Sequence, residues 1–332
     1  MPRAFRAAFT LVVFITAFWT TSAIVRAFVP EQMKFAWLLE IEDDMEVIFV
    51  GSSHVLRQMD PAVLHHELSK AGLDYDAFNL GYPGAHFAET TYWADRILDR
   101  KVPNLKVLVL EAATLEGGMN PENDLSRRQI EWHDERRMAS VLRVSADFDS
   151  FGRHFAHYFH RLGNLDRGPA AFEALFFGAS RDFEGKAGLG VNQTGFRPFV
   201  GNGQSKSEKR RHKEFLADAD PFEGKRRSVV DAPWDIPAHL ALESEVARLE
   251  AKAEANGVQI IWLIHPGMTP AEGWKDLARR EVASRVVDFS DSTLSSRWYQ
   301  QNLRFDFDHL NAVGASEMTQ ELAGAVLQLP TL

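Results

Sequence analysis

The sequence contains no cysteine, and this absence removes several kinds of chemistry at once. Thiol nucleophiles, structural disulfides and zinc sites with cysteine ligands are all excluded. An extracytoplasmic location stays open, because a protein in an oxidising compartment does not require disulfides.

Positive charge is in deficit as well. The 332 residues include 37 Lys and Arg against 46 Asp and Glu, which gives a formal net charge of -9. Phosphate binding requires a basic surface, so this balance argues against a nucleic-acid partner. Hydrophobic residues make up 45% and charged residues 25%, a globular composition, and the length suits one large or two ordinary domains.

A long uncharged stretch lies near the N-terminus. Ala7–Val25 is 19 residues between flanking arginines, and a helix of this length covers roughly 28 Å, close to the bilayer core. We favour an uncleaved membrane anchor with its N-terminus inside. A signal peptide cleaved near Thr21-Ser22-Ala23 and a buried helix of a soluble protein are the alternatives. Both the membrane anchor and the signal peptide place the rest of the chain outside the cytoplasm.

Short apolar strands alternate with amphipathic helices over much of the chain. This alternation predicts a parallel α/β sheet with right-handed crossovers, and we expect five strands in a flavodoxin-like three-layer sandwich. The pattern is lost between about 115 and 234, which predicts a large insertion after the third strand. Strands are predicted at 47–50, 75–80, 107–110, 259–264 and 285–289, and helices near 60–72, 87–98, 126–144, 151–162, 235–256 and 316–327.

The first strand leads directly into Gly51-Ser52-Ser53. A strand that ends in a tight turn presents a serine hydroxyl at the carboxyl edge of the sheet. A nucleophilic serine requires a base and a group that orients the base. Asp306 and His309 supply both residue types after the fifth strand, and the topology brings that loop to the same edge. We therefore predict Ser53 as nucleophile, His309 as base and Asp306 as its orienting carboxylate.

Neighbouring residues offer alternatives to these assignments. Ser52 competes with Ser53, and Asp308 competes with Asp306, although the three-residue spacing favours Asp306. His54 and His86 flank the predicted pocket and are interpreted as surface or packing residues more readily than as substrate contacts.

Several other residues have either a functional or a purely structural interpretation. Trp132-His133-Asp134 could cover the site from the insertion, and His265 could support it from the end of the fourth strand. His154, His157 and His160 recur on one helix face, but no carboxylate accompanies them, so we predict no metal site and no cofactor. The basic run 206–213 is interpreted as a solvated face, with contact to an anionic glycan or lipid headgroup as the alternative.

These motifs together resemble those of the SGNH/GDSL hydrolase superfamily. Gly51-Ser52-Ser53 stands at the first family block and Asn79-Leu-Gly-Tyr-Pro-Gly84 is similar to the second. Asp306-Phe-Asp-His309, followed by Leu310-Asn-Ala-Val-Gly, is similar to the last block of envelope members such as alginate O-acetyltransferases and teichoic-acid D-alanyl transfer proteins. The resemblance covers roughly 45–112 and 257–328 and implies that the backbone N–H groups of Ser53 and Gly84 hold an oxyanion.

The sequence departs from the family pattern at two places. Ser52 replaces the aspartate of the first block, which leaves the nucleophile in place. The third block, Gly-x-Asn-Asp, is missing, and Glu111-Ala-Ala-Thr114 follows the third strand instead. Thr114 is the nearest substitute for the asparagine that donates to the oxyanion, and the loss of one such donor costs on the order of 10²–10³ in rate.

The resemblance implies a division into an anchor or signal peptide at 1–28 and an SGNH hydrolase-like domain at 29–332, with the insertion at about 115–234. We expect a membrane-anchored extracytoplasmic serine esterase or O-acyltransferase. The expected partners are an acylated glycan or small ester, the membrane and envelope polysaccharide machinery. The alternative function is a weakly active or inactive SGNH-like domain that binds envelope glycan or supports a polysaccharide export or modification complex.

Overall fold

The computed structural model describes residues 3–28, 32–113, 127–144, 148–163, 189–201, 203, 205–218, 236–266, 272–290 and 296–330. The chain forms two compact units. The smaller unit comprises Met1–Gln32 and Gly117–Glu184, and the larger comprises Met33–Glu116 and Gly185–Leu332. The predicted domain boundaries at 28 and at 115–234 stay predictions.

The larger unit is built on a five-stranded, all-parallel sheet with the order β2-β1-β3-β4-β5. This is the predicted flavodoxin-like α/β architecture. Val50 pairs with Leu80 on one side and with Leu110 on the other, so β1, β2 and β3 end together at one edge. The strands are β1 (Val47–Gly51), β2 (Ala77–Gly81), β3 (Val107–Glu111), β4 (Gln259–Ile264) and β5 (Val286–Asp288).

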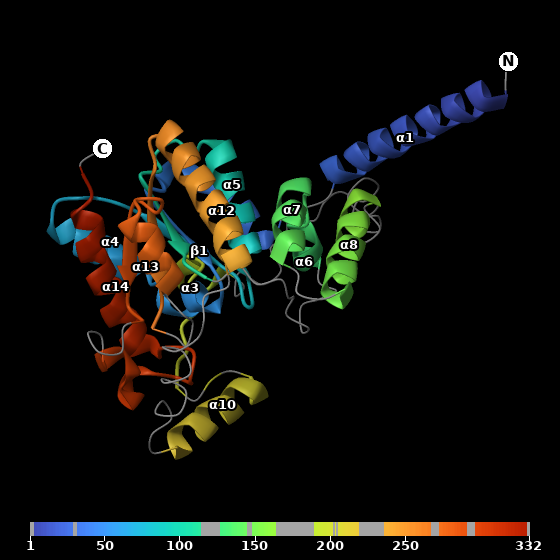
Figure 1. Cartoon of the computed structure of the whole chain (residues 1–332). Coiled ribbons are helices and arrows are strands. Elements are labelled where there is room, and N and C mark those ends of the chain that lie inside the picture. The colour runs from blue at the N-terminus through green and yellow to red at the C-terminus, as the bar shows by residue number, and fades with distance from the viewer. Residues whose placement is uncertain are drawn as a thin grey trace. The chain divides into compact units, whose positions relative to one another are not determined.

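Helices cover both faces of this sheet (Figure 1). Phe49 and Val109 pack with Leu64 and Met318 in one buried core under α4 and α14. Because side chains alternate along a strand, residues such as Ile48 point to the opposite face, where α5 and α12 pack against each other. The covering helices are α4 (Pro61–Lys70), α14 (Ala312–Leu327), α5 (Phe87–Arg100) and α12 (Ile236–Ala255).

Local signals explain where several helices begin. Asp60 accepts hydrogen bonds from the backbone N–H groups of the first turn of α4, and Pro61 occupies the first position. The prediction of α14 from residue 316 was too short, because Asn311 caps the helix and moves its start to Ala312. The sequence also gave no prediction of α3 (Ser53–Gln58), which Ser52 caps directly after β1. Other helices of this unit are α2 (Met33–Glu40), α10 (Lys206–Ala217) and α13 (Glu272–Arg279).

The smaller unit contains α1 (Arg3–Phe28), α6 (Arg127–Glu131), α7 (Glu135–Val144) and α8 (Phe148–Gly163). Among the described residues, Phe5–Val25 is the one helical stretch that is long and apolar enough to cross a membrane. A signal sequence near the N-terminus would have the same length and composition. Only 6% of the stretch is buried, which is unlike the core helix of a soluble protein. The predicted N-terminal apolar helix is thus present in the structure.

Candidate active site

The turn after β1 places Ser53 at the carboxyl edge of the sheet. Ser52 is the N-cap of α3, and its hydroxyl accepts a hydrogen bond from the backbone N–H of His54 at 3.2 Å. Ser53 is therefore the first helical residue. A Cβ atom at Gly51 would lie 2.5 Å from both a Glu111 oxygen and a Val55 methyl group. Glycine is required there because β1 approaches both side chains.

The loop that carries His309 is organised by a buried arginine. Burial lowers the pKa of Arg304 to about 10, which still leaves the side chain cationic at neutral pH. Because its guanidinium binds main-chain carbonyls on both sides of Asp306, this loop has one defined path. The accepting carbonyls are those of Pro266 (2.6 Å), Trp298 (3.2 Å), Asp306 (3.2 Å) and Phe307 (2.6 Å).

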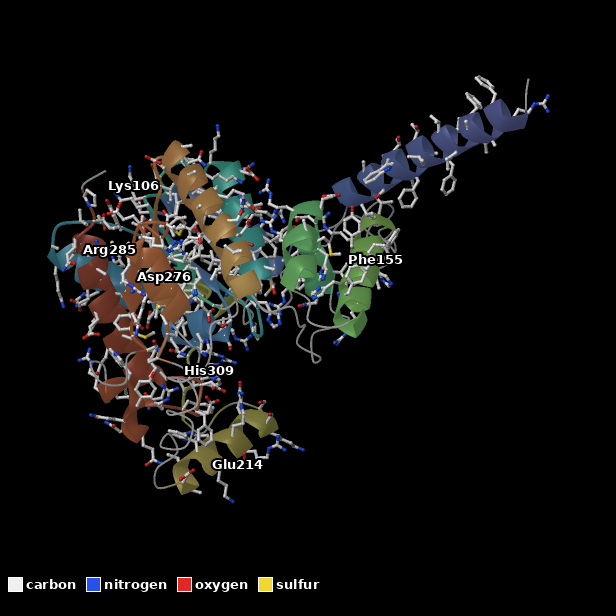
Figure 2. All side chains as sticks on the ribbon, in the orientation of Figure 1. Lys106, Phe155, Glu214, Asp276, Arg285 and His309 are labelled. Carbon is white, nitrogen blue, oxygen red and sulfur yellow. The ribbon has the colours of Figure 1, made fainter. Side chains whose placement is uncertain are left out.

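The structure brings Ser53, His309 and Asp306 into one hydrogen-bonded chain. His309 Nε2 lies 2.9 Å from Ser53 Oγ, and His309 Nδ1 lies 2.9 Å from Asp306 Oδ1 (His309 is labelled in Figure 2). The same carboxylate oxygen accepts the backbone N–H groups of Asp308 (2.9 Å) and His309 (2.8 Å). Of the competing residues, Ser52 serves as a helix cap and Asp308 donates a backbone N–H to Asp306.

Burial and pairing set the protonation states in this chain. Burial alone would raise the pKa of the Asp306 carboxyl, but its hydrogen bond with His309 and the charge of His309 bring the pKa below its ordinary value. Burial lowers the pKa of His309, and the opposing effect of Asp306 only partly offsets this. At neutral pH the arrangement is a carboxylate, a neutral imidazole and a serine hydroxyl, the states that a triad requires before attack.

Glu111 belongs to the site and was missed by the sequence analysis. Its carboxylate accepts hydrogen bonds from the backbone N–H of Ser52 and from Ser52 Oγ at 2.9 Å, and it pairs with His54 Nδ1 at 2.9 Å. Burial would raise the pKa of Glu111, but His54 and the backbone of Ser52 lower it to about 2. A carboxylate that ends an otherwise apolar parallel strand was the available signal, because such strand ends meet at the functional edge.

Two further histidines stand at this edge. The ring centroid of His54 lies 5.1 Å from that of His309 and 5.3 Å from that of His265, which follows β4. Burial lowers the pKa of His265 to about 3, so this imidazole is neutral at neutral pH. The structure therefore places His54 beside His309 and His265 beside His54, whereas His86 occupies the N-cap position of α5.

Of the two expected oxyanion donors beyond Ser53, Gly84 and Thr114, the structure describes only Gly84. Gly84 lies in the turn after β2 with φ of 64°, a conformation that favours glycine. Thr114 lies outside the described residues. Asn79 fixes this region, because its amide donates to the carbonyls of Val55 (2.7 Å) and Met59 (2.8 Å) and so ties β2 to the end of α3.

Segments from the predicted insertion pack against the His309 loop within the larger unit. The ring of Phe199 stacks on Phe305 at 4.0 Å and meets His309 edge-on at 5.3 Å. Arg211 on α10 places Nε 3.6 Å from Asp306 Oδ2, and His212 Nδ1 contacts the Phe305 carbonyl at 2.7 Å. Part of the basic run 206–213 thus faces the loop of the site, while Lys209 and Arg210 are exposed.

The histidines of α8 lie in the smaller unit. His154 and His157 are buried and His160 is exposed. His154 Nδ1 lies 2.9 Å from Nε2 of His133, whose Nδ1 lies 2.7 Å from the Gln129 carbonyl. Across the described ranges no group of three His, Cys, Asp or Glu residues is arranged to hold a metal ion. The proposed cover formed by Trp132-His133-Asp134 stays a prediction.

Comparison with known proteins adds no family to this description. No family model matches the chain, and no curated protein matches it. The resemblance to SGNH/GDSL hydrolases therefore stays a prediction from the motif residues.

Proposed function

We propose that the protein is a serine esterase or O-acyltransferase of the SGNH/GDSL type. The observation that carries the proposal is the hydrogen-bonded chain Ser53–His309–Asp306, with 2.9 Å at both links. A serine hydroxyl, a neutral imidazole and an ionised carboxylate in this order are the components of an activated nucleophile.

The proposed reaction begins when Ser53 attacks the carbonyl carbon of an acyl ester. His309 Nε2 accepts the hydroxyl proton as the new C–O bond forms, and Asp306 stabilises the resulting imidazolium. When the tetrahedral intermediate collapses, the alcohol leaves with that proton and the acyl group stays on Ser53. Water or a sugar hydroxyl then gives up its proton to His309 and takes the acyl group, and His309 returns that proton to Ser53 Oγ, which restores the free serine and the neutral imidazole.

Charge on the substrate oxygen would be stabilised by main-chain donors. The backbone N–H of Ser53 belongs to the first turn of α3, where no acceptor exists within the helix. The turn at Gly84 would supply the second N–H, as the family resemblance implies. No side-chain amide stands at Glu111, which ends β3, or at the two alanines that follow it, so two donors would carry most of this stabilisation.

The substrate class and location are proposed from the N-terminal helix and from the resemblance. A span at Phe5–Val25 would hold the larger unit at the extracytoplasmic face of a membrane. Ester-linked acyl groups on envelope or exported polysaccharides are accessible at that face. We therefore propose an acylated glycan as the donor or acceptor, within an envelope polysaccharide machinery.

One observation supports a second candidate function. Glu111-Ala-Ala-Thr114 stands where SGNH/GDSL enzymes carry Gly-x-Asn-Asp, so the asparagine donor is absent, and Glu111 is an anion that cannot donate to an oxyanion. A domain with a weak oxyanion site would instead bind envelope glycan or support a polysaccharide export or modification complex.

An assay with an acetylated oligosaccharide separates these functions. The full chain in detergent is incubated with the substrate, and free acetate and acetylated acceptor are quantified against Ser53→Ala. Acetate release identifies an esterase, and acetyl transfer to a second oligosaccharide identifies a transferase. Equal product with the wild type and Ser53→Ala, together with retained glycan binding, would instead favour the binding domain.

A further inference from the structure

A second hydrogen-bonded network lies directly beside the proposed triad. Ser52 and His54 flank Ser53 in the chain, and both are bound to the Glu111 carboxylate. Glu111 ends β3 and His54 lies in the first turn of α3. One buried carboxylate therefore holds the residues on both sides of the proposed nucleophile.

The network joins a negative group, Glu111, to a positive one, His54. Glu111 is 6% exposed and stays anionic, because its pKa is lowered to about 2. Burial alone would lower the pKa of its partner His54, but the hydrogen bond and charge of Glu111 outweigh burial and raise it. In mildly acidic solution, the buried Glu111 and the half-buried His54 thus form a carboxylate–imidazolium pair.

The imidazolium of His54 lies next to the proposed base. The ring centroids of His54 and His309 are 5.1 Å apart. A cation at this distance opposes protonation of His309, whereas Asp306 favours it. The charged and titratable groups that face His54 from the surrounding elements are Glu111 from β3, His265 from the end of β4, and Arg304, Asp308 and His309 from the loop before α14.

We propose that Glu111 and His54 are positioning residues that maintain a cation beside His309 and so keep this base free of a proton in mildly acidic solution. The proposal rests on the proposed function and deepens it. It gives a role to Glu111, which begins the segment that replaces the Gly-x-Asn-Asp block of SGNH/GDSL enzymes. It also explains the glycine at position 51, since a Cβ atom there would collide with the carboxylate.

The test is the pH dependence of Ser53 labelling by a fluorophosphonate probe, measured from about pH 4 to about pH 8 on the full chain. The pH at which the labelling rate falls to half on the acid side should rise by roughly one unit in both His54→Gln and Glu111→Gln, because the cation beside His309 is lost. His65→Gln is the matched control, since His65 lies on α4 and pairs with Asp76, and its half-rate pH should coincide with that of the wild type. An unshifted half-rate pH in both test variants would overturn the proposal.

A second readout keeps this proposal separate from the proposed function. NMR of ¹³Cε1-labelled histidine, with His309→Gln to assign the signal, reports the titration of His309 whether or not the serine reacts. If the midpoint of the His309 titration rises in His54→Gln while the wild type shows no labelling of Ser53, the effect of His54 on His309 is supported and the proposed enzymatic function is contradicted. Where the glutamine variant does not fold, His54→Phe preserves an aromatic ring without the charge and should give the same shift.

A separate observation concerns α8 in the smaller unit. His154, His157 and Leu162 are buried, whereas Phe151, Phe155 and Phe159 are 37%, 45% and 52% exposed. Their spacing of four residues puts the three phenylalanines on one stripe of the helix (Phe155 is labelled in Figure 2). Neighbouring rings of the stripe contact each other, with centroids 6.0 and 4.8 Å apart.

The stripe is joined to the apolar N-terminal helix. Ser22 on α1 is buried and donates its hydroxyl to the Leu162 carbonyl at 2.5 Å, one turn beyond Phe159 on α8. Ser22 lies three residues before the end of the stretch Phe5–Val25. The aromatic stripe therefore starts close to the end of that stretch, and aromatic rings are favoured at the level of the lipid headgroups.

We infer that α8 lies on a lipid bilayer through Phe151, Phe155 and Phe159, at the end of the span formed by α1. A lipid surface is favoured over a protein partner because the stripe is continuous with an exposed apolar helix of membrane-spanning length. This surface would hold the smaller unit against the membrane, independently of any catalytic activity.

The absence of cysteine permits a direct test with single-cysteine variants carrying an environment-sensitive NBD label. The full chain is reconstituted in phosphatidylcholine–phosphatidylglycerol vesicles that contain doxyl-labelled lipid. Labels at Phe155→Cys and Phe159→Cys should be quenched, as at Phe14→Cys within α1. A label at Arg153→Cys, exposed on the opposite side of α8, should not be quenched. Water-like, unquenched emission at 155 and 159, with or without quenching at 14, would overturn the inference.

Discussion

Ser53 Oγ lies 2.9 Å from Nε2 of His309, although the two residues are 256 positions apart in the chain. Ser53 follows the end of β1, and His309 lies in the loop between β5 and α14. A doubly wound parallel sheet collects such loops at its carboxyl edge, so the fold itself creates this contact.

The orienting carboxylate should be Asp306 rather than Asp308. Asp306→Asn removes the charge that stabilises the His309 imidazolium and should lower the rate of Ser53 labelling by about 10³–10⁴. Asp308→Asn is the matched control, because its backbone N–H still reaches Asp306 after the substitution. The two labelling rates are measured under identical conditions, and an equal loss in both variants would contradict the assignment.

Asn79 should stabilise the fold through its side chain. Its amide donates to two carbonyls of the α3 region, and its oxygen accepts the Gly81 N–H at 2.9 Å. Asn79→Ala leaves these buried groups without partners and should lower the free energy of unfolding by about 2–3 kcal/mol. Asn104→Ala, in an exposed turn, should change it by less than about 1 kcal/mol. Urea unfolding followed by circular dichroism measures both changes.

Two glycines of α14 should respond in opposite directions to alanine. A Cβ atom at Gly314 would lie 2.3 Å from the Leu303 carbonyl oxygen, so Gly314→Ala must displace the segment before the helix and destabilise it. No atom lies within 4 Å of a Cβ atom at Gly324, and Gly324→Ala should stabilise the helix by about 0.5–1 kcal/mol. Thermal unfolding distinguishes the two, and equal shifts would contradict the packing at Leu303.

Glu111 should make folding stability depend on pH in the acid range. Its pKa is about 2 in the folded chain against an ordinary value of 4.5, so the unfolded chain takes up this proton first as the pH falls. The contribution is therefore complete above about pH 4.5 and is lost as the pH falls towards 2, amounting to about 3 kcal/mol. The difference in unfolding free energy between wild type and Glu111→Gln should shrink over that interval. A difference that stays constant with pH would contradict the paired state of Glu111.

The strand framework was predictable because it depends on local patterns. Apolar runs of four to six residues and capping signals such as Asp60-Pro61 locate the elements, and their alternation predicts a parallel sheet. The sheet then places Ser53 and His309 at one edge without knowledge of any contact. In the structure His309 hydrogen-bonds with Ser53 and Asp306, and the roles of these residues as nucleophile and orienting carboxylate stay predictions.

The missed features depend on contacts that no local pattern encodes. In the sequence, Glu111 is only the polar end of a predicted strand. Its role depends on the pairing of β1 with β3, which brings its carboxylate to Ser52 and His54. The helix α3 is only six residues long, and its cap Ser52 is also the alternative to Ser53 as nucleophile. Phe199 and Arg211 reach the His309 loop from a region without periodicity, so their positions follow from packing alone.

Ser53 should act as a nucleophile that His309 activates. The most direct measurement is reaction of the folded full chain with a fluorophosphonate, followed by peptide mass spectrometry to locate the adduct. We predict one adduct on the peptide that contains Ser53, its absence in Ser53→Ala, and a large loss of rate in His309→Gln. A folded wild-type chain without an adduct, or an adduct on Ser52 in place of Ser53, would contradict this account.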